Sequence, residues 1–71
     1  MKMNSVKSSQ ISEIGHDPAT KTLAVKFKTG GVYHYGNVSA SDHHTLVTAH
    51  SVGSHFATNI KNQPKFPATK Q

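Results

Sequence analysis

The chain has 71 residues and no cysteine, so we expect one small domain and exclude both a disulfide framework and a thiolate metal site. Its eight basic residues are all lysines and outnumber three acidic residues, which gives a net charge of +5. This charge favours polyanionic partners such as RNA, DNA or nucleotides. Because arginine's bidentate fork is absent, such binding is expected to be salt-sensitive and weakly selective for sequence.

No stretch approaches the roughly 18 apolar residues of a membrane span. The basic start also lacks the apolar run, about 7 to 15 residues long, of a secretory signal. The sequence therefore predicts a cytoplasmic protein without a membrane partner.

The N-terminal part of the chain predicts an arm followed by a strand. Residues 1–8 are polar and are expected to be flexible. Residues 9–16 predict a strand, but Ile11 and Ile14 in it are three positions apart, which does not fit strict alternation. We therefore expect an irregularity in this strand near residues 12–13.

A hairpin follows. Asp17-Pro18 supplies turn chemistry, because the Asp side chain can bond the backbone and proline presets its φ. Residues 22–28 then alternate apolar and polar side chains, which predicts a half-buried strand. Its apolar face consists of Leu23, Val25 and Phe27.

The length of the next loop decides where two tyrosines point. A three-residue loop of residues 29–31 places Tyr33 and Tyr35 opposite Phe27 and Val25 on the apolar face. A two-residue loop shifts the register by one, so that both tyrosines face the lysines of the neighbouring strand. The three-residue loop is favoured because tyrosine makes the better cross-strand pairs with apolar partners.

After residue 38 the spacing of apolar side chains changes from the period of a strand to that of a helix. Ser39 followed by Asp42 resembles a capping box and predicts a helix over residues 40–50. Gly53 is expected to end it, and Ser54 to cap a second short helix that runs through residue 60.

The fold class expected from these elements is α+β. We predict a three-stranded antiparallel β-meander followed by two short α-helices packed on one face. The domain should span residues 9–61, and residues 62–71 lack periodicity and predict an irregular C-terminal tail.

The six histidines do not predict a metal site, and His43 and His44 are expected to be solvated residues of a helix face. No pair has the i, i+4 spacing of helical zinc ligands, and no cysteine assists. Catalysis is not indicated either, because the few carboxylates have simpler roles in turns and caps. We expect no enzyme activity, no cofactor and no metal.

The start of the second helix is a candidate anion site. Free backbone N–H groups would be exposed there, Gly53 permits close approach, and Ser54, His55 and Asn59 lie nearby to contribute hydrogen bonds. An ordinary N-cap that joins two helices is the favoured alternative.

The order of certain residues resembles that of the KTSC family. The shared positions are Val6, Ser8-Ser9, Ile11, Ile14-Gly15, Leu23-x-Val25-x-Phe27, Gly30, Tyr33-His34-Tyr35, Val38, Ser51-Val52-Gly53-Ser54-His55-Phe56 and Ile60-Lys61. Two positions depart from the pattern: His16 stands where an aromatic residue is usual, and Ser39 where proline often precedes the helix.

The resemblance implies a binding module rather than an enzyme. Such domains occur at the C-terminus of some lysyl-tRNA synthetases and as stand-alone proteins in bacteria and phages, and RNA binding has been suggested for them. A short isolated chain would fit a phage-type protein, which would act in the cytoplasm of the host.

These observations lead to one hypothesis and two alternatives. The expected function is binding of RNA or a nucleotide-like anion on a surface that joins Lys26, Lys28, Tyr33 and Tyr35 to the Gly53-Ser54 helix start. One alternative is a small regulator that docks on an acidic patch of a host protein. Another is a homo-oligomer that sequesters a signalling nucleotide.

Overall fold

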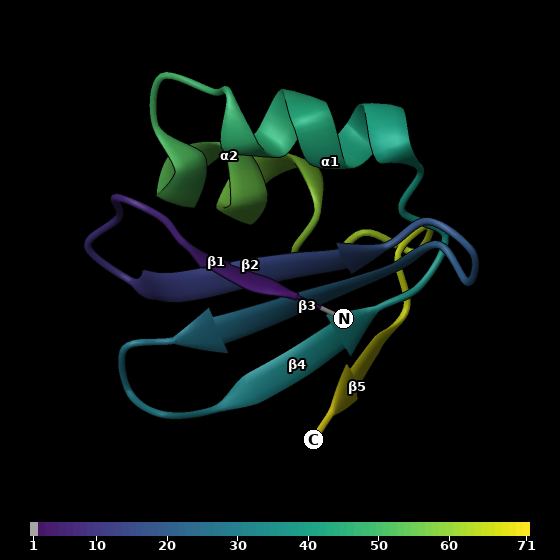
Figure 1. Cartoon of the computed structure of the whole chain (residues 1–71), viewed down its shortest axis with the longest axis horizontal. Coiled ribbons are helices and arrows are strands. Elements are labelled where there is room, and N and C mark those ends of the chain that lie inside the picture. The colour runs from purple at the N-terminus through teal and green to yellow at the C-terminus, as the bar shows by residue number, and fades with distance from the viewer. Residues whose placement is uncertain (1) are drawn as a thin grey trace.

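An antiparallel sheet carries both helices on one of its faces (Figure 1). The structure is a computed structural model and describes residues 2–71. The sheet has five strands in chain order: β1 (Met3–Ser5), β2 (Ile11–Asp17), β3 (Thr22–Phe27), β4 (Val32–Tyr35) and β5 (Ala68–Lys70). Helices α1 (Ala40–Val47) and α2 (Val52–Asn59) lie between β4 and β5. Neither is long and apolar enough to cross a membrane.

The irregularity predicted in β2 is confirmed. The pairing of β2 with β3 shifts between Ile11 and Glu13. Because of this shift, Ile11 and Ile14 both reach the face under the helices although they are three residues apart, and they are 0% and 1% exposed. The predicted turn is also present, since the Ala19 N–H donates to Asp17 Oδ1 over 3.0 Å.

The β3–β4 loop has the predicted length but begins one residue earlier. The Phe27 N–H donates to the Gly31 carbonyl and the Gly30 N–H to the Phe27 carbonyl, each over 2.9 Å, so the loop is residues 28–30. Gly30 occupies the position that requires a positive φ, which is +103°.

This displacement changes the partners of the tyrosines but not their face. Tyr33 pairs with Val25 and Tyr35 with Leu23, whereas the expected partners were Phe27 and Val25. The register differs by two residues, and side chains alternate with period two, so both tyrosines still lie on the apolar face.

The capping box at the start of α1 is confirmed. The Asp42 N–H donates to Ser39 Oγ over 3.0 Å, and the Ser39 N–H donates to Asp42 Oδ2 over 3.3 Å. The helix is shorter than predicted, because it ends at Val47 with Thr48 as its C-cap. The Thr48 hydroxyl donates to the His44 carbonyl over 2.7 Å and thereby satisfies a carbonyl of the last turn.

The predicted start of the second helix is wrong. Ser51 is the N-cap of α2 and accepts a hydrogen bond from the Ser54 N–H over 3.3 Å, so Gly53 and Ser54 lie inside the first turn. Gly53 does not end a helix. It allows the β1–β2 loop to approach, because a Cβ at this position would lie 2.9 Å from Ser8 Oγ.

Both ends of the chain differ from the prediction, because each forms an additional strand of the sheet. Residues 3–5 of the expected flexible arm pair with β2, and residues 68–70 of the expected irregular tail pair with β4. The segment before β5 is also anchored, since the Gly36 N–H donates to the Pro67 carbonyl over 2.9 Å. Backbone groups at the edges of a three-stranded sheet are open to such pairing. Met1 lies outside the described residues.

The hydrophobic core lies between the sheet and the two helices. Its buried members are Ile11, Ile14, Leu23, Val25, Tyr35, Val38, Leu46, Val52, Phe56, Ile60 and Phe66. Phe56 of α2 and Ile60, the C-cap of that helix, are four residues apart, and both are buried in the core. Phe66, from the segment between α2 and β5, extends the core beyond the helices.

Candidate ligand pocket

A pocket of about 700 Å³ opens between the β3–β4 hairpin and the segment that joins α2 to β5. It is lined by Phe27, Tyr33, Tyr35, Lys61, Asn62, Gln63, Pro64, Phe66, Pro67 and Ala68. Volumes of this order are typical of sites for small organic ligands. The pocket exists because the helices leave this part of the sheet uncovered and the C-terminal segment forms the opposite wall.

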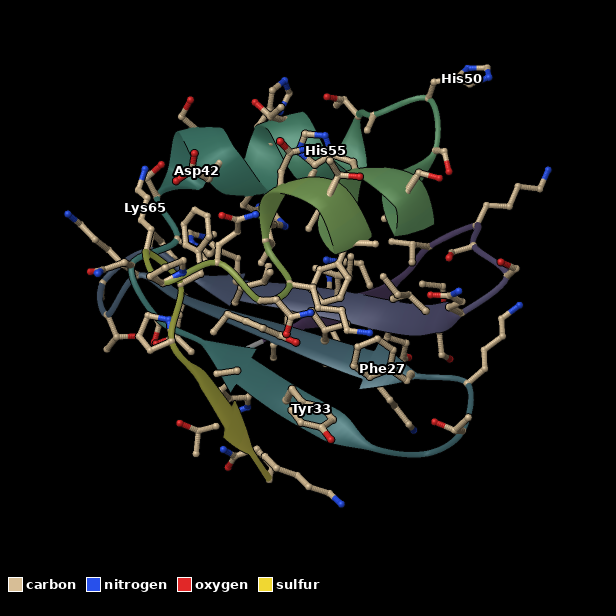
Figure 2. The ribbon with its side chains drawn as sticks, turned by 180° about the vertical axis from the view of Figure 1, so that it is seen from behind. Phe27, Tyr33, Asp42, His50, His55 and Lys65 are labelled. Carbon is tan, nitrogen blue, oxygen red and sulfur yellow. The ribbon has the colours of Figure 1, made fainter. Side chains whose placement is uncertain are left out.

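Aromatic rings form the wall on the side of the sheet. Phe27 and Tyr33 lie on neighbouring strands with ring centroids 5.7 Å apart and planes at 81° (Figure 2). Phe27 also meets Phe56 of α2 edge-on at 5.7 Å. Because each ring supports the next, the wall is preorganised before any ligand arrives.

Tyr35 is the most buried of the pocket residues that carry a polar side chain. Its side chain is only 4% exposed, and its ring packs edge-on against Phe56 at 5.3 Å. Burial raises the pKa of the Tyr35 phenol, and the nearby Tyr33 phenol adds to the effect. The phenol therefore stays protonated at neutral pH and is able both to donate and to accept a hydrogen bond.

Lysines supply positive charge around this pocket. Lys61 is part of the lining. Lys70 pairs directly with Tyr33 across the β4–β5 ladder, and directly paired residues project from the same face of a sheet. Lys28 is exposed in the hairpin loop next to Phe27. The pocket thus combines apolar rings with one lysine in its lining, and two further lysines lie on the neighbouring strand and loop.

Of the residues predicted from sequence for the site, Tyr33 and Tyr35 lie together in this pocket. Lys26 does not join them. It is exposed and pairs with Glu13 and Val32, which places it on the opposite face of the sheet from Tyr33. The expected single surface of Lys26 with both tyrosines is therefore not formed.

The helix-start residues line other hollows. Gly53 and Ser54 border a small hollow of about 170 Å³ beside the β1–β2 loop. His55 and Asn59 border another, of about 380 Å³, and the Asn59 amide is already engaged because it donates to the His55 carbonyl over 3.2 Å. This second hollow is bordered by both helices, since Asp42 of α1 and His55 of α2 both line it (Figure 2). The predicted anion site is thus separate from the tyrosines.

Sequence reasoning missed the wall formed by the C-terminal segment. Lys61, Phe66 and Pro67 were assigned to the end of the domain or to an irregular tail, yet all three line the pocket. Phe66 provided a signal, because a large apolar side chain in a polar tail indicates a docked segment. It is buried to 8% exposure, and Lys65 Nζ lies 5.3 Å from the centre of its ring.

The histidines are arranged differently from the sequence-based expectation. His43 was expected to be a solvated residue of the helix face, but it is half-buried and stacks on His16 with centroids 4.8 Å apart and planes at 10°. His16 Nε2 lies 2.6 Å from the Val38 carbonyl oxygen, which holds the ring in place. Within residues 2–71, no group of three or more potential ligand side chains is arranged to hold a metal ion.

Comparisons with known proteins agree on one family. The profile of the KTSC domain matches residues 7–66. An uncharacterised protein of Stutzerimonas stutzeri is 35% identical over 63 residues, which cover 89% of each chain. A lysine–tRNA ligase of Nostoc punctiforme is 37% identical over 60 residues, which cover 84% of this chain but 11% of that protein.

A solved structure supports the same assignment at the level of the fold. The crystal structure of a KTSC domain protein from Yersinia pestis superposes with a TM-score of 0.91 and 34% sequence identity. The match covers 99% of this chain and 96% of that one, so it includes the two outer strands as well as the central meander. The chain belongs to the KTSC domain family.

Proposed function

We propose that this protein is a non-enzymatic module that binds single-stranded RNA or a free nucleotide in the aromatic pocket. The observation that carries the proposal is the combination of the exposed parts of Phe27 and Tyr33 with lysines on the same side of the sheet. Bases stack on aromatic rings whatever their sequence, and lysines neutralise phosphate. These are the two contributions that a nucleotide unit requires.

The size and shape of the pocket favour one unstacked nucleotide over a duplex. A volume of about 700 Å³ accommodates a base with its sugar. The groove of a double helix is usually read by a protruding helix or ribbon, whereas bases of single strands enter hollows lined by aromatic rings. A relative whose name is lysine–tRNA ligase supports a role connected with RNA. RNA and nucleotides are abundant in the cytoplasm, which we propose as the site of action.

Stacking on Tyr33 provides the first test. Alanine at a stacked aromatic position costs about 1–3 kcal/mol, so Tyr33→Ala should weaken binding of a short labelled RNA roughly 5- to 150-fold. His34→Ala is the matched control, because His34 is the next residue of β4 and points to the opposite face. Fluorescence anisotropy at low salt measures both affinities, and urea unfolding checks that both variants fold.

The proposal fails under either of two results. The first is that neither RNA nor any mononucleotide binds the wild-type protein at low salt. The second is that Tyr33→Ala and His34→Ala change the affinity equally, since this would place binding outside the pocket.

A further inference from the structure

Tyr35 differs from the other rings of the pocket in how firmly it is held. Its strand lies between two others, and Tyr35 pairs with Leu23 on one side and Ala68 on the other. On the side of the helices, the ring of Phe56 packs against it edge-on, with the two ring planes at 83°. Tyr33, by contrast, is half-buried and forms the outer part of the wall. The Tyr35 hydroxyl therefore has a position that packing determines in advance.

Within the part of the chain that the structure describes, this hydroxyl has no hydrogen-bond partner. In the same part of the chain, no fully enclosed polar side-chain atom lacks a partner. The hydroxyl therefore remains accessible. Tyr35 lines the pocket described above and also a hollow beside His34 and Thr69, but its side chain lies on the same face of the sheet as Tyr33 and thus on the side of the pocket.

The Tyr35 side chain is thus 96% buried, while its hydroxyl stays open to the pocket. Phenylalanine would fill the same space without a polar atom. The packed ring therefore presents to the pocket a polar atom that the core does not use, as recognition of a polar ligand requires. This is the second observation, independent of the aromatic wall, that points to a ligand.

We propose that Tyr35 determines specificity by forming a hydrogen bond to the edge of the base that stacks against Tyr33 and Phe27. The inference rests on the proposed function and adds to it the recognition of one base over others. Bases differ in the donors and acceptors on their edges. A stacked base would shield the phenol from water, so a base with a mismatched edge would leave it unpaired, which is the costly outcome for a buried polar group.

The test compares the four mononucleotides AMP, GMP, CMP and UMP as competitors of a labelled RNA. One hydrogen bond lost at a buried site corresponds to a difference of about 3- to 10-fold, and we expect the wild-type protein to prefer at least one base by this factor. In Tyr35→Phe, the four affinities should converge to within about twofold. His34→Ala alters the opposite face of the same strand and should retain the preference.

A separate measurement distinguishes recognition from a structural role. If the Tyr35 hydroxyl supported only the fold, Tyr35→Phe would lower the urea midpoint of unfolding. We expect the midpoint of this variant to equal or exceed that of the wild type, because no internal hydrogen bond is lost. A lowered midpoint would overturn the inference.

The remaining outcomes separate this inference from the proposed function. Equal affinities of the wild-type protein for all four mononucleotides would overturn the inference and leave the binding function standing. A base preference that persists in Tyr35→Phe would have the same effect. If no mononucleotide and no RNA binds, the proposed function fails and the inference with it.

Discussion

Two adjacent glycines in the β3–β4 loop have different structural roles. Gly30 has a φ of +103°, and any residue with a Cβ is strained there, although no atom lies within 4 Å of the position. Gly31→Ala, in contrast, would bring its Cβ only into ordinary contact with Tyr33, at 3.6 Å from Cε1. Gly30→Ala should therefore lower the free energy of unfolding by about 1–2 kcal/mol, and Gly31→Ala should change it little.

Urea unfolding of the two glycine variants measures this difference. It also tests the hairpin register, because Gly31 would be the third residue of the loop predicted from sequence, residues 29–31, and the third residue takes the positive φ. A larger loss in Gly31→Ala than in Gly30→Ala would contradict the observed loop.

The stacked histidines make stability depend on pH. The pKa of His43 lies below its ordinary value of 6.5, first because burial disfavours the charged ring and then because His16 and His44 repel it. The unfolded chain binds the proton more readily, so this contribution to stability is present above pH 6.5 and is lost as the pH falls through 6.5 towards the lowered pKa.

Urea midpoints measured above and below pH 6.5 check this prediction. His43→Gln should reduce the drop in stability on acidification. His50→Gln is the control, because His50 is exposed and points away from the molecule (Figure 2). An equal drop in wild type and His43→Gln would show that the stacked pair does not cause the acid sensitivity.

At the scale of elements, the capping box of α1 is the contact most open to a direct test. Ser39→Ala removes the acceptor of the Asp42 N–H and should cost about 1 kcal/mol of unfolding free energy. Ser41→Ala is the matched control, since Ser41 is an exposed serine inside the same helix. Thermal or urea unfolding of both variants measures the contrast. Equal stability of the two variants would mean that the cap contributes nothing to the fold.

Elements with strong local signals could be predicted, and elements fixed by pairing alone could not. The strand with Leu23 and Val25 alternates clearly, and the capping box marks the start of α1. β1 and β5 have three residues each and no alternation of buried side chains, so they exist because the sheet edges offer backbone partners. The start of α2 was misplaced because Gly53 reads locally as a helix break, while its actual role depends on Ser8, far away in the sequence.

The same distinction applies to the candidate site. Tyr33 and Tyr35 were identified because their strand and loop have local signatures. Period-two alternation separates Lys26 from them in the favoured register, so its inclusion in the predicted surface rested on charge alone. Lys61 and Phe66 became part of the site only through the return of the chain to β5, which no short stretch of sequence encodes.

At the scale of the whole molecule, the position of the lysines decides whether the charge of +5 acts as a general attraction or as a specific contact. Lys61 lines the pocket and Lys70 shares its face, whereas Lys26 lies on the opposite face of the sheet. If two phosphate contacts form at the pocket, the logarithm of RNA affinity should fall with the logarithm of salt concentration at a slope of about −1.4.

Replacement of single lysines by glutamine tests this arrangement, with anisotropy titrations at several salt concentrations as the measurement. Lys61→Gln and Lys70→Gln should each make the slope less negative by about 0.7, because each removes one phosphate contact. Lys26→Gln lowers the net charge by the same amount and should leave the slope unchanged. If all three variants reduce the slope equally, the protein attracts RNA by its total charge, and the pocket has no part in holding the phosphate.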